Sequence, residues 1–160
     1  MTLSSILVIC LGNICRSPVG EFALKKAFSE HKLSINVESA GTTSYNEGCT
    51  YDDRSIASAK KRGLNLRGFS RPLIAEDFSS FDLLLCCDGD IYRTVLKRCP
   101  SAHKHKVKLF REFDPNAKGY LDIDDPWYSN SSRAFDEVTD ICIRSAENIV
   151  ALIKSNSLNL

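Results

Sequence analysis

The sequence predicts an α/β fold in which a four-stranded parallel sheet carries helices on both faces. Two observations lead to this prediction. Short apolar runs alternate along the chain with longer segments whose apolar residues recur at helical spacing. Strands that alternate with helices pair in parallel through right-handed crossovers, and the crossover helices cover both faces of the sheet. In such sheets, ligands bind beyond the carboxyl ends of the strands.

The first expected strand and helix meet at a cysteine. Residues 6–10 form an apolar, β-branched run of strand length. Ser17 and Pro18 are expected to open a helix that ends near Glu30, because proline leaves no unsatisfied amide in the first turn and Ser17 can cap the exposed amides. Residues 35–38 alternate apolar and polar side chains, which predicts the second strand.

The middle of the chain repeats this pattern. Asp52 or Asp53 can cap a helix, and Gly63 provides the left-handed residue that ends it. Residues 81–87 form a continuous apolar run, which predicts a third strand. Asp88 and the glycine after it end this run, and a helix is expected to follow.

The last third of the chain adds one strand, one long loop and one long helix. Residues 107–110 predict a fourth, shorter strand, and residues 114–126 form an acidic loop of a length that is often functional. From Ser131 onward, apolar residues recur at helical spacing as far as Leu152. The chain is therefore expected to end in a helix that packs along one side.

Composition indicates an ordinary globular protein. The chain has 160 residues, 43% of them hydrophobic and 26% charged, so a single domain over residues 1–160 is expected. A formal net charge of +1 argues against nucleic acid as a partner. No apolar run approaches the roughly 18 residues of a membrane span, so we expect no membrane insertion. Residues 1–5 lack the pattern of a signal peptide, and a cytoplasmic location is expected.

Cysteine usage fits a reducing compartment. The seven cysteines are odd in number and lack the spacing of a disulfide framework, so they are expected to be thiols. No C-x-x-C pair is present, and the sequence therefore predicts neither a metal site nor a cofactor.

The loop after the first strand has the composition of an oxyanion site. Cys10 is followed after five residues by Arg16, and the loop closes onto the start of a helix. Consecutive amides of such a loop can surround an anion. The same positive field favours thiolate over thiol at Cys10, while Arg16 can hold two oxygens at once. The expected phosphate-binding residues are Leu11, Gly12, Asn13, Ile14, Cys15, Arg16 and Ser17.

Two residue types in this loop have expected conformational roles. Gly12 permits an unusual backbone angle, and Asn13 tolerates left-handed geometry and can brace the loop by hydrogen bonds. Ser17 can donate a hydrogen bond to the Cys10 thiolate. The plain alternative is that Cys10 is a buried packing residue, since cysteine is among the most buried residue types. Its position between a buried strand and a Ser-Pro helix start favours the catalytic interpretation.

Two separate motifs resemble those of the low-molecular-weight protein tyrosine phosphatases. They are residues 10–18 together with Glu21, and residues 124–128, which read Asp-Asp-Pro-Trp-Tyr. The resemblance covers essentially the whole chain and implies the phosphotyrosine protein phosphatase I-like fold with flavodoxin-type winding. It implies that Cys10 attacks phosphorus to form a phosphocysteine, with no metal, while Arg16 and the loop amides hold the phosphoryl oxygens. Asp125 would protonate the leaving phenolate and then deprotonate the attacking water.

The resemblance also implies a substrate class. Tyr45, Trp127 and Tyr128 are expected at the rim of a deep slot that accepts a flat aryl phosphate and excludes the shorter phosphoserine. Phosphotyrosine-containing proteins are the expected partners, and inorganic phosphate or other oxyanions are expected as product or inhibitor. General acid phosphatase activity is a further possibility.

Several points stay open at this stage. Cys15 either forms a reversible disulfide with Cys10 or is a small packing residue. Mammalian members of the family brace the loop with a histidine whose position here matches Gly68, so the bracing differs in this chain. One alternative is an arsenate reductase, which needs two further cysteines on a mobile segment to relay a disulfide; adjacent Cys86 and Cys87 on an apolar strand do not resemble such a relay. Another is an arginine phosphatase, against which Ile14 argues. A non-catalytic phosphotyrosine-binding module would be expected to lose Cys10 or Asp125.

Overall fold

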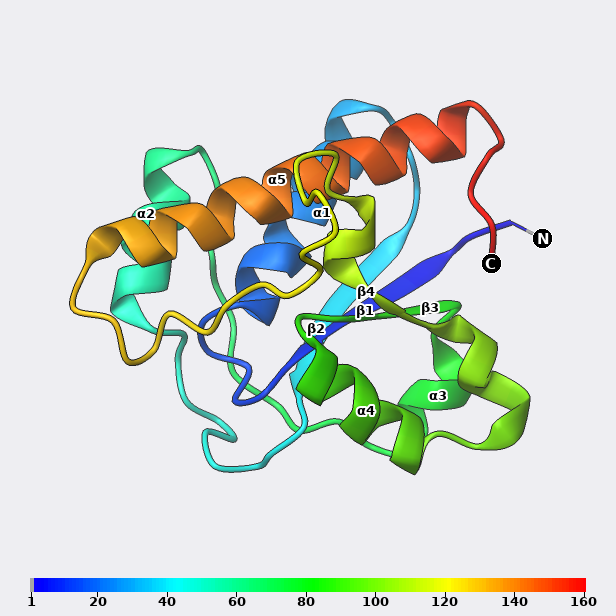
Figure 1. Ribbon diagram of the computed structural model, residues 1–160, viewed down its shortest axis with the longest axis horizontal. Helices are drawn as coiled ribbons and strands as arrows, with labels where there is room; N and C mark the ends of the chain where they lie inside the picture. The colour runs from blue at the N-terminus through cyan, green and yellow to red at the C-terminus, as the bar shows by residue number, and fades with distance from the viewer. Residues whose placement is uncertain (1) are drawn as a thin grey trace.

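The computed structural model describes residues 2–160 and has the predicted parallel sheet at its centre (Figure 1). The strands pair in the order β2-β1-β3-β4, all in parallel, which is flavodoxin-type winding. The predicted fold class is confirmed. The strands are β1 (Ser5–Cys10), β2 (Asn36–Gly41), β3 (Leu83–Cys86) and β4 (Val107–Leu109).

Helices cover both faces of the sheet (Figure 1). One face packs against α1 (Ser17–Glu30), α2 (Asp53–Lys61) and α5 (Ser132–Lys154), and α5 lies along α1. The other face packs against α3 (Asp77–Ser80) and α4 (Gly89–Arg98). Two short 3-10 helices, η1 (Ser101–Lys106) and η2 (Phe110–Phe113), flank β4.

The central strand β1 joins two apolar cores. All six of its residues are buried, and successive side chains point to opposite faces. Ile6, Val8 and Cys10 lie in the core beneath α1 and α5, whereas Leu7 and Ile9 lie in the core beneath α3 and α4. Cys10 therefore ends a strand whose position is fixed by packing on both sides.

Most of the predicted helix boundaries are confirmed, with one correction. Asp52 caps α2 by accepting a hydrogen bond from the amide of Arg54, and Gly63 follows this helix with a φ of +81°. Ser17, however, does not cap α1: the cap position is Arg16, no side chain caps it, and Ser17 is already helical. The reason is that the Ser17 hydroxyl is turned toward Cys10.

Segments distant in sequence meet at the carboxyl ends of the strands. The loops after β1, β2 and β3 all leave this edge, and the amide of Thr42 donates to the carbonyl of Cys10 at 2.9 Å. The long loop that precedes α5 joins them, because the amide of Ile123 donates to the carbonyl of Cys87 at 2.8 Å. Both termini lie at the other end of the molecule (Figure 1). Within residues 2–160, no helix has the length and hydropathy that crossing a membrane requires.

Candidate active site

Cys10 lies at the base of the site, at the point where β1 ends. Its side chain is 2% exposed, and its sulfur lies 3.0 Å from the hydroxyl of Ser17. The amide of Asn13 donates to the same sulfur at 3.3 Å. Hydrogen-bond donors that face a sulfur stabilise its ionised form. The cysteine loop, residues 10–17, therefore places polar hydrogen-bonding groups around the Cys10 sulfur.

Asn13 fixes the shape of the cysteine loop. Its φ is +54°, in the left-handed region that asparagine tolerates better than most residues, and it is fully buried. Its side-chain nitrogen donates to Ser17 Oγ at 2.7 Å and to Ser39 Oγ at 3.0 Å, while its oxygen accepts from the amide of Arg71 at 2.9 Å. These contacts hold the left-handed turn, as the residue type predicts.

Gly12 is needed for space and not for its backbone angle. Its φ does not lie in the left-handed region, which corrects the expectation of an unusual angle. A Cβ at this position would lie 2.6 Å from the side-chain nitrogen of Asn46, closer than non-bonded atoms approach. The same nitrogen donates to the Gly12 carbonyl at 3.3 Å, and Ser70 Oγ donates to it at 3.0 Å. The absence of a side chain lets the Asn46 side chain reach the loop.

A buried carboxylate lies at the far end of this hydrogen-bond network. Ser39 Oγ donates to Glu21 at 2.6 Å, and Glu21 is 7% exposed. A continuous chain of hydrogen bonds thus connects Glu21 with Ser39, Asn13, Ser17 and Cys10. Because Glu21 accepts the proton of Ser39, the Ser39 oxygen is free to accept from Asn13, and the same Asn13 nitrogen donates to Ser17, whose hydroxyl lies beside the sulfur.

Tyr51 occupies the space beside Gly68. The φ of Gly68 is +130°, and a Cβ there would lie 3.0 Å from the hydroxyl of Tyr51. Burial and the charge of Glu21 raise the pKa of Tyr51 to about 12, so its hydroxyl stays protonated near Glu21. In this chain Asn13 is braced by Ser39 and by the Arg71 backbone, with Tyr51 filling the space next to them.

Arg16 is held in place by groups from two other segments. It is 2% exposed, and its Nη1 donates to Asp88 at 2.6 Å and to the carbonyl of Ile123 at 2.8 Å. The second carboxylate oxygen of Asp88 accepts from the amide of Ile91 at 2.8 Å, which caps α4. One carboxylate therefore orients the guanidinium and the helix together.

Asp125 lies across the pocket from the cysteine loop. It belongs to the aspartate loop, residues 122–131, and its Oδ2 lies 3.6 Å from Nη2 of Arg16. The other two acids of this loop have different partners, because Asp122 accepts from the Gly89 amide and Asp124 accepts from the Tyr120 hydroxyl. Of the three, Asp125 alone lines the pocket that contains Cys10.

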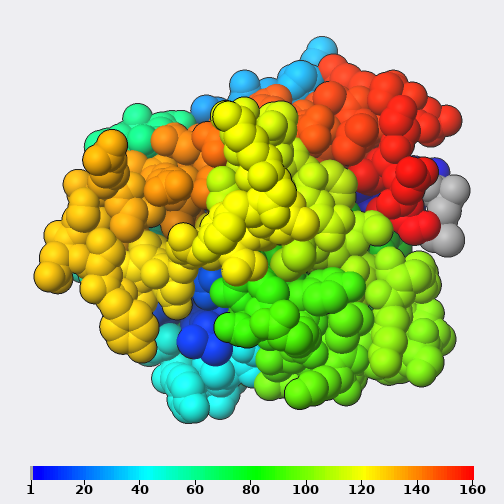
Figure 2. All heavy atoms as spheres, in the orientation of Figure 1, coloured from blue at the N-terminus to red at the C-terminus, as the bar shows by residue number. Residues whose placement is uncertain are grey.

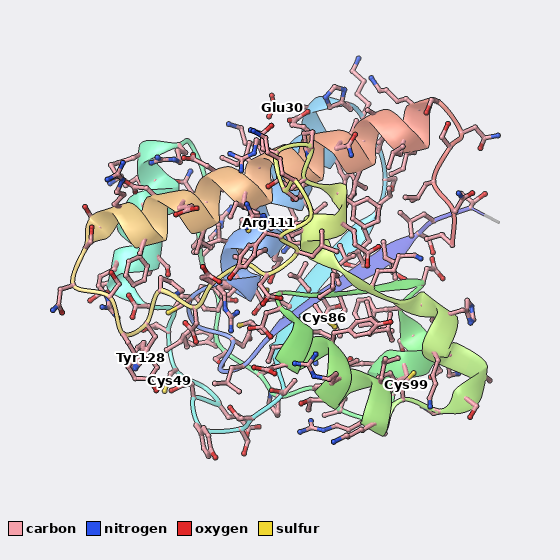
Figure 3. The ribbon with its side chains drawn as sticks, viewed as in Figure 1. Glu30, Cys49, Cys86, Cys99, Arg111 and Tyr128 are labelled. Atoms are coloured by element: carbon pink, nitrogen blue, oxygen red, sulfur yellow. The ribbon has the colours of Figure 1, made fainter. Side chains whose placement is uncertain are left out.

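The two loops enclose a pocket of about 290 Å³. Figure 2 shows the blue atoms of the cysteine loop recessed between the cyan segment around residue 45 and the yellow-orange aspartate loop. Tyr45 and Tyr128 are 86% and 88% exposed and line the mouth, with Trp127 at 45%. Tyr128 lies on the outer edge of its loop in Figure 3. The structure thus brings together the predicted residues Cys10, Arg16, Asp125, Tyr45, Trp127 and Tyr128 around one cavity.

The other cysteines have surroundings unlike those of Cys10. Cys15 also lines the pocket, but burial and the charge of Asp52 raise its pKa to about 12, so it is a thiol near neutral pH. Burial likewise raises the pKa of Cys86, Cys87 and Cys142. All seven cysteines are free. A disulfide between Cys10 and Cys15 stays a prediction.

Several residues that contact the site were not expected from the sequence as site residues. Asp88, Ser39, Tyr51 and Asn46 come from segments that follow or end other strands, so their position at the carboxyl edge was the available signal. Across residues 2–160, no group of three or more His, Cys, Asp or Glu side chains is placed to bind a metal ion.

Comparison with known proteins agrees with this geometry. The family model for low molecular weight phosphotyrosine protein phosphatase matches residues 5–158. The human and mouse proteins of that name are each 35% identical to this chain over 144 residues, covering 88% of this chain and 89% of theirs. A crystal structure of a protein tyrosine phosphatase from Entamoeba histolytica, with Hepes in its active site, superposes with a TM-score of 0.92 at 36% identity, over 97% of this chain and 99% of that one. The chain belongs to the low molecular weight phosphotyrosine protein phosphatase family.

Proposed function

We propose that this protein hydrolyses phosphotyrosine in proteins through a phosphocysteine intermediate, without a metal ion. One observation carries the proposal. A buried cysteine that faces two hydrogen-bond donors shares a pocket with a fixed arginine and one aspartate. This set of groups supplies the nucleophile, the oxyanion-binding group and the acid that cleavage of a phosphate ester needs.

The first step transfers the phosphoryl group to Cys10. The loop amides and Arg16 hold the phosphoryl oxygens, and Cys10 Sγ attacks phosphorus opposite the ester oxygen. A sulfur–phosphorus bond forms as the bond from phosphorus to the phenolic oxygen breaks. Asp125, protonated at this stage, gives its proton to the departing oxygen. Asp88 and Ile123 occupy Nη1 of Arg16, which leaves its other nitrogens for substrate.

The second step releases phosphate. Asp125, now ionised, takes a proton from a water molecule whose oxygen attacks phosphorus, and the sulfur–phosphorus bond breaks. The electron pair returns to Cys10 as a thiolate, and Ser17 and Asn13 stabilise it by their hydrogen bonds. Because the same donors favour sulfur as the leaving group, they assist both the formation and the breakdown of the intermediate.

The pocket supports an aryl phosphate as substrate. Its mouth is lined by three aromatic residues, and Cys10 lies at its base, so a long, flat side chain reaches the sulfur better than a short one. Ile14 lines the same pocket and is an apolar neighbour for a guanidinium phosphate, which disfavours phosphoarginine. Cys86 and Cys87 are fully buried, which disfavours an arsenate-reducing disulfide relay. The proposal includes a reducing cytoplasmic setting, since Cys10 must stay reduced to act as the nucleophile.

The proposal is tested with the wild type, Cys10→Ser and Asp125→Ala. Each is assayed in EDTA on a phosphotyrosine peptide, on phosphoarginine and on arsenate. We expect the wild type to turn over phosphotyrosine but neither phosphoarginine nor arsenate. On phosphotyrosine we expect no turnover by Cys10→Ser and a loss of about 10²- to 10⁴-fold for Asp125→Ala. Turnover by Cys10→Ser, loss of wild-type activity in EDTA, or a clear preference for phosphoarginine or arsenate would each contradict the proposal.

A further inference from the structure

The aspartate loop has few supports of its own. Within it, the amide of Trp127 donates to Asp125 Oδ1 at 3.1 Å, and the amide of Ser129 donates to the carbonyl of Pro126 at 2.9 Å. Both hydrogen bonds join residues two or three apart and close local turns. They shape the loop but do not fix where it lies relative to Cys10. The position of Asp125 therefore depends on contacts from outside the loop. Ile123 anchors the chain before Asp125 through Cys87 and Arg16, so the segment after Asp125 needs a separate support.

Arg54, in the first turn of α2, supplies such contacts. Its Nη1 lies 3.4 Å from the carbonyl of Trp127 and 3.3 Å from that of Ser129, donating to both. Its guanidinium carbon lies 5.4 Å from the centre of the Trp127 ring and 4.5 Å from that of Phe135, in α5. A guanidinium over an aromatic face is attracted to it, so Arg54 binds both the backbone and the side chain of the loop.

The other side of Arg54 is fixed by Asp52. Nε and Nη2 of Arg54 donate to the two carboxylate oxygens of Asp52 at 3.1 and 2.9 Å, a bidentate pair. The side chain of Asp52 is 9% exposed. The amide of Asp52 donates to the carbonyl of Ile14 at 3.0 Å. A short path of contacts therefore crosses from Ile14 in the cysteine loop to Trp127 in the aspartate loop.

We propose that Arg54 is a positioning residue that sets the aspartate loop against the cysteine loop, and so sets how well Asp125 delivers its proton. The inference rests on the proposed phosphatase function. The direct contact between Asp125 and Arg16 cannot fix this distance during the reaction, because Arg16 then holds the phosphoryl group. Arg54 does not line the pocket that contains Cys10, so its contacts with the aspartate loop do not compete with those of a bound phosphoryl group.

The test compares Arg54→Ala and Arg54→Lys with the wild type. Arg133→Ala is the matched control, since Arg133 is an exposed arginine near the same loop. Two substrates are used: a phosphotyrosine peptide, whose leaving group needs a proton, and an aryl phosphate with an acidic fluorinated phenol, which needs none. The parameter is kcat/KM, because it reports the step in which the ester bond breaks.

We expect Arg54→Ala to lower kcat/KM on phosphotyrosine about tenfold and on the acidic phenol ester less than about threefold, since only proton delivery is impaired. The kcat/KM of Arg54→Lys on phosphotyrosine should lie between those of the wild type and Arg54→Ala, because lysine keeps the charge but lacks the planar guanidinium. The double variant with Arg54→Ala and Asp125→Ala should have nearly the same kcat/KM on phosphotyrosine as Asp125→Ala alone. Equal losses on both substrates, no loss, or additive losses with Asp125→Ala would overturn the inference.

A second measurement is independent of turnover. Trp127 is the one tryptophan of the chain, so intrinsic fluorescence reports its surroundings directly. Arg54→Ala should change the emission of Trp127, whereas Arg133→Ala should leave it unchanged; an unchanged emission in Arg54→Ala would overturn the contact itself. If the wild type hydrolyses neither ester, the proposed function fails, and the fluorescence result still decides whether Arg54 holds the loop.

Discussion

The cysteine loop and the aspartate loop form two walls of one pocket but are held in different ways. In the cysteine loop, Asn13 and Ser17 are fully buried and their side chains have close hydrogen-bond partners. In the aspartate loop, the Asp125 side chain is 32% exposed and Tyr128 is 88% exposed. Groups that stabilise a developing oxyanion act best when they are preformed. The comparison therefore separates a rigid binding wall from a more adjustable wall that carries the acid and the specificity.

The largest expected effect comes from replacing the fixed cation of the rigid wall. Arg16→Lys should lower kcat/KM for an aryl phosphate by about 10³-fold, because lysine cannot hold two phosphoryl oxygens while contacting Asp88 and Ile123. Steady-state kinetics measures this effect. A loss below about tenfold would mean that the charge alone is sufficient and that the rigid geometry is unimportant.

The next effect tests whether the rigidity resides in Asn13. Asn13→Ala removes three side-chain hydrogen bonds and places alanine at a φ of +54°. We expect a loss of about 2 kcal/mol in the free energy of unfolding, together with a loss of about 10- to 100-fold in kcat. Urea unfolding and kinetics provide both values. Asn116→Ala, in an exposed turn far from the pocket, is the control.

The rim of the adjustable wall should respond in binding and not in stability. Tyr45→Ala should raise KM for a phosphotyrosine peptide about three- to tenfold and change the free energy of unfolding by less than about 0.5 kcal/mol, because its side chain is 86% exposed. The measurement pairs peptide kinetics with a urea melt. If kcat fell and KM stayed constant, the rim would have to be assigned to the chemical step.

The smallest effect concerns the pH dependence of the contact between the walls. Burial alone would raise the pKa of Asp52, but hydrogen bonds from Arg54 outweigh burial and hold this pKa below its usual range. A lowered pKa in the folded state stabilises the fold above the unfolded value of about 3.9, and the contribution is lost as pH falls through the folded value. Asp52→Asn keeps the helix cap and removes the charge, so it should cost less than about 1 kcal/mol at pH 7. The difference should begin to shrink as pH falls below about 4 and be lost as pH passes through the lower folded-state pKa, and urea melts across pH 2–7 would show whether it does.

Local sequence predicted the rigid wall better than the adjustable one. Residues 10–17 are consecutive, and their strand, loop and helix are legible from apolar periodicity and from the Ser-Pro helix start. The errors arose where tertiary contacts changed a local preference: the Ser17 hydroxyl faces sulfur in place of capping, and Gly12 makes room for Asn46. Both depend on atoms from distant segments.

The supports of the site could not be predicted in this way. Asp88 reaches Arg16 across a separation of 72 residues, and Arg54 reaches the carbonyl of Trp127 across 73. No periodicity encodes such pairs, since they depend on how strand order and loop course bring the segments together. Asp125 itself was distinguished from its acidic neighbours by the family resemblance, and the structure adds a physical distinction, because Asp122 and Asp124 are bound elsewhere.

The fixed position of Ile123 has a consequence for the length of the chain before it. Ile123 is fully buried, its amide is bound to Cys87 and its carbonyl to Arg16, so the chain is anchored two residues before Asp125. The turn at residues 116–119 precedes this anchor and is largely exposed. We therefore expect that turn to accept inserted residues, an epitope or a fluorescent label without displacing Asp125, and retained kcat/KM of such an insertion variant would show it.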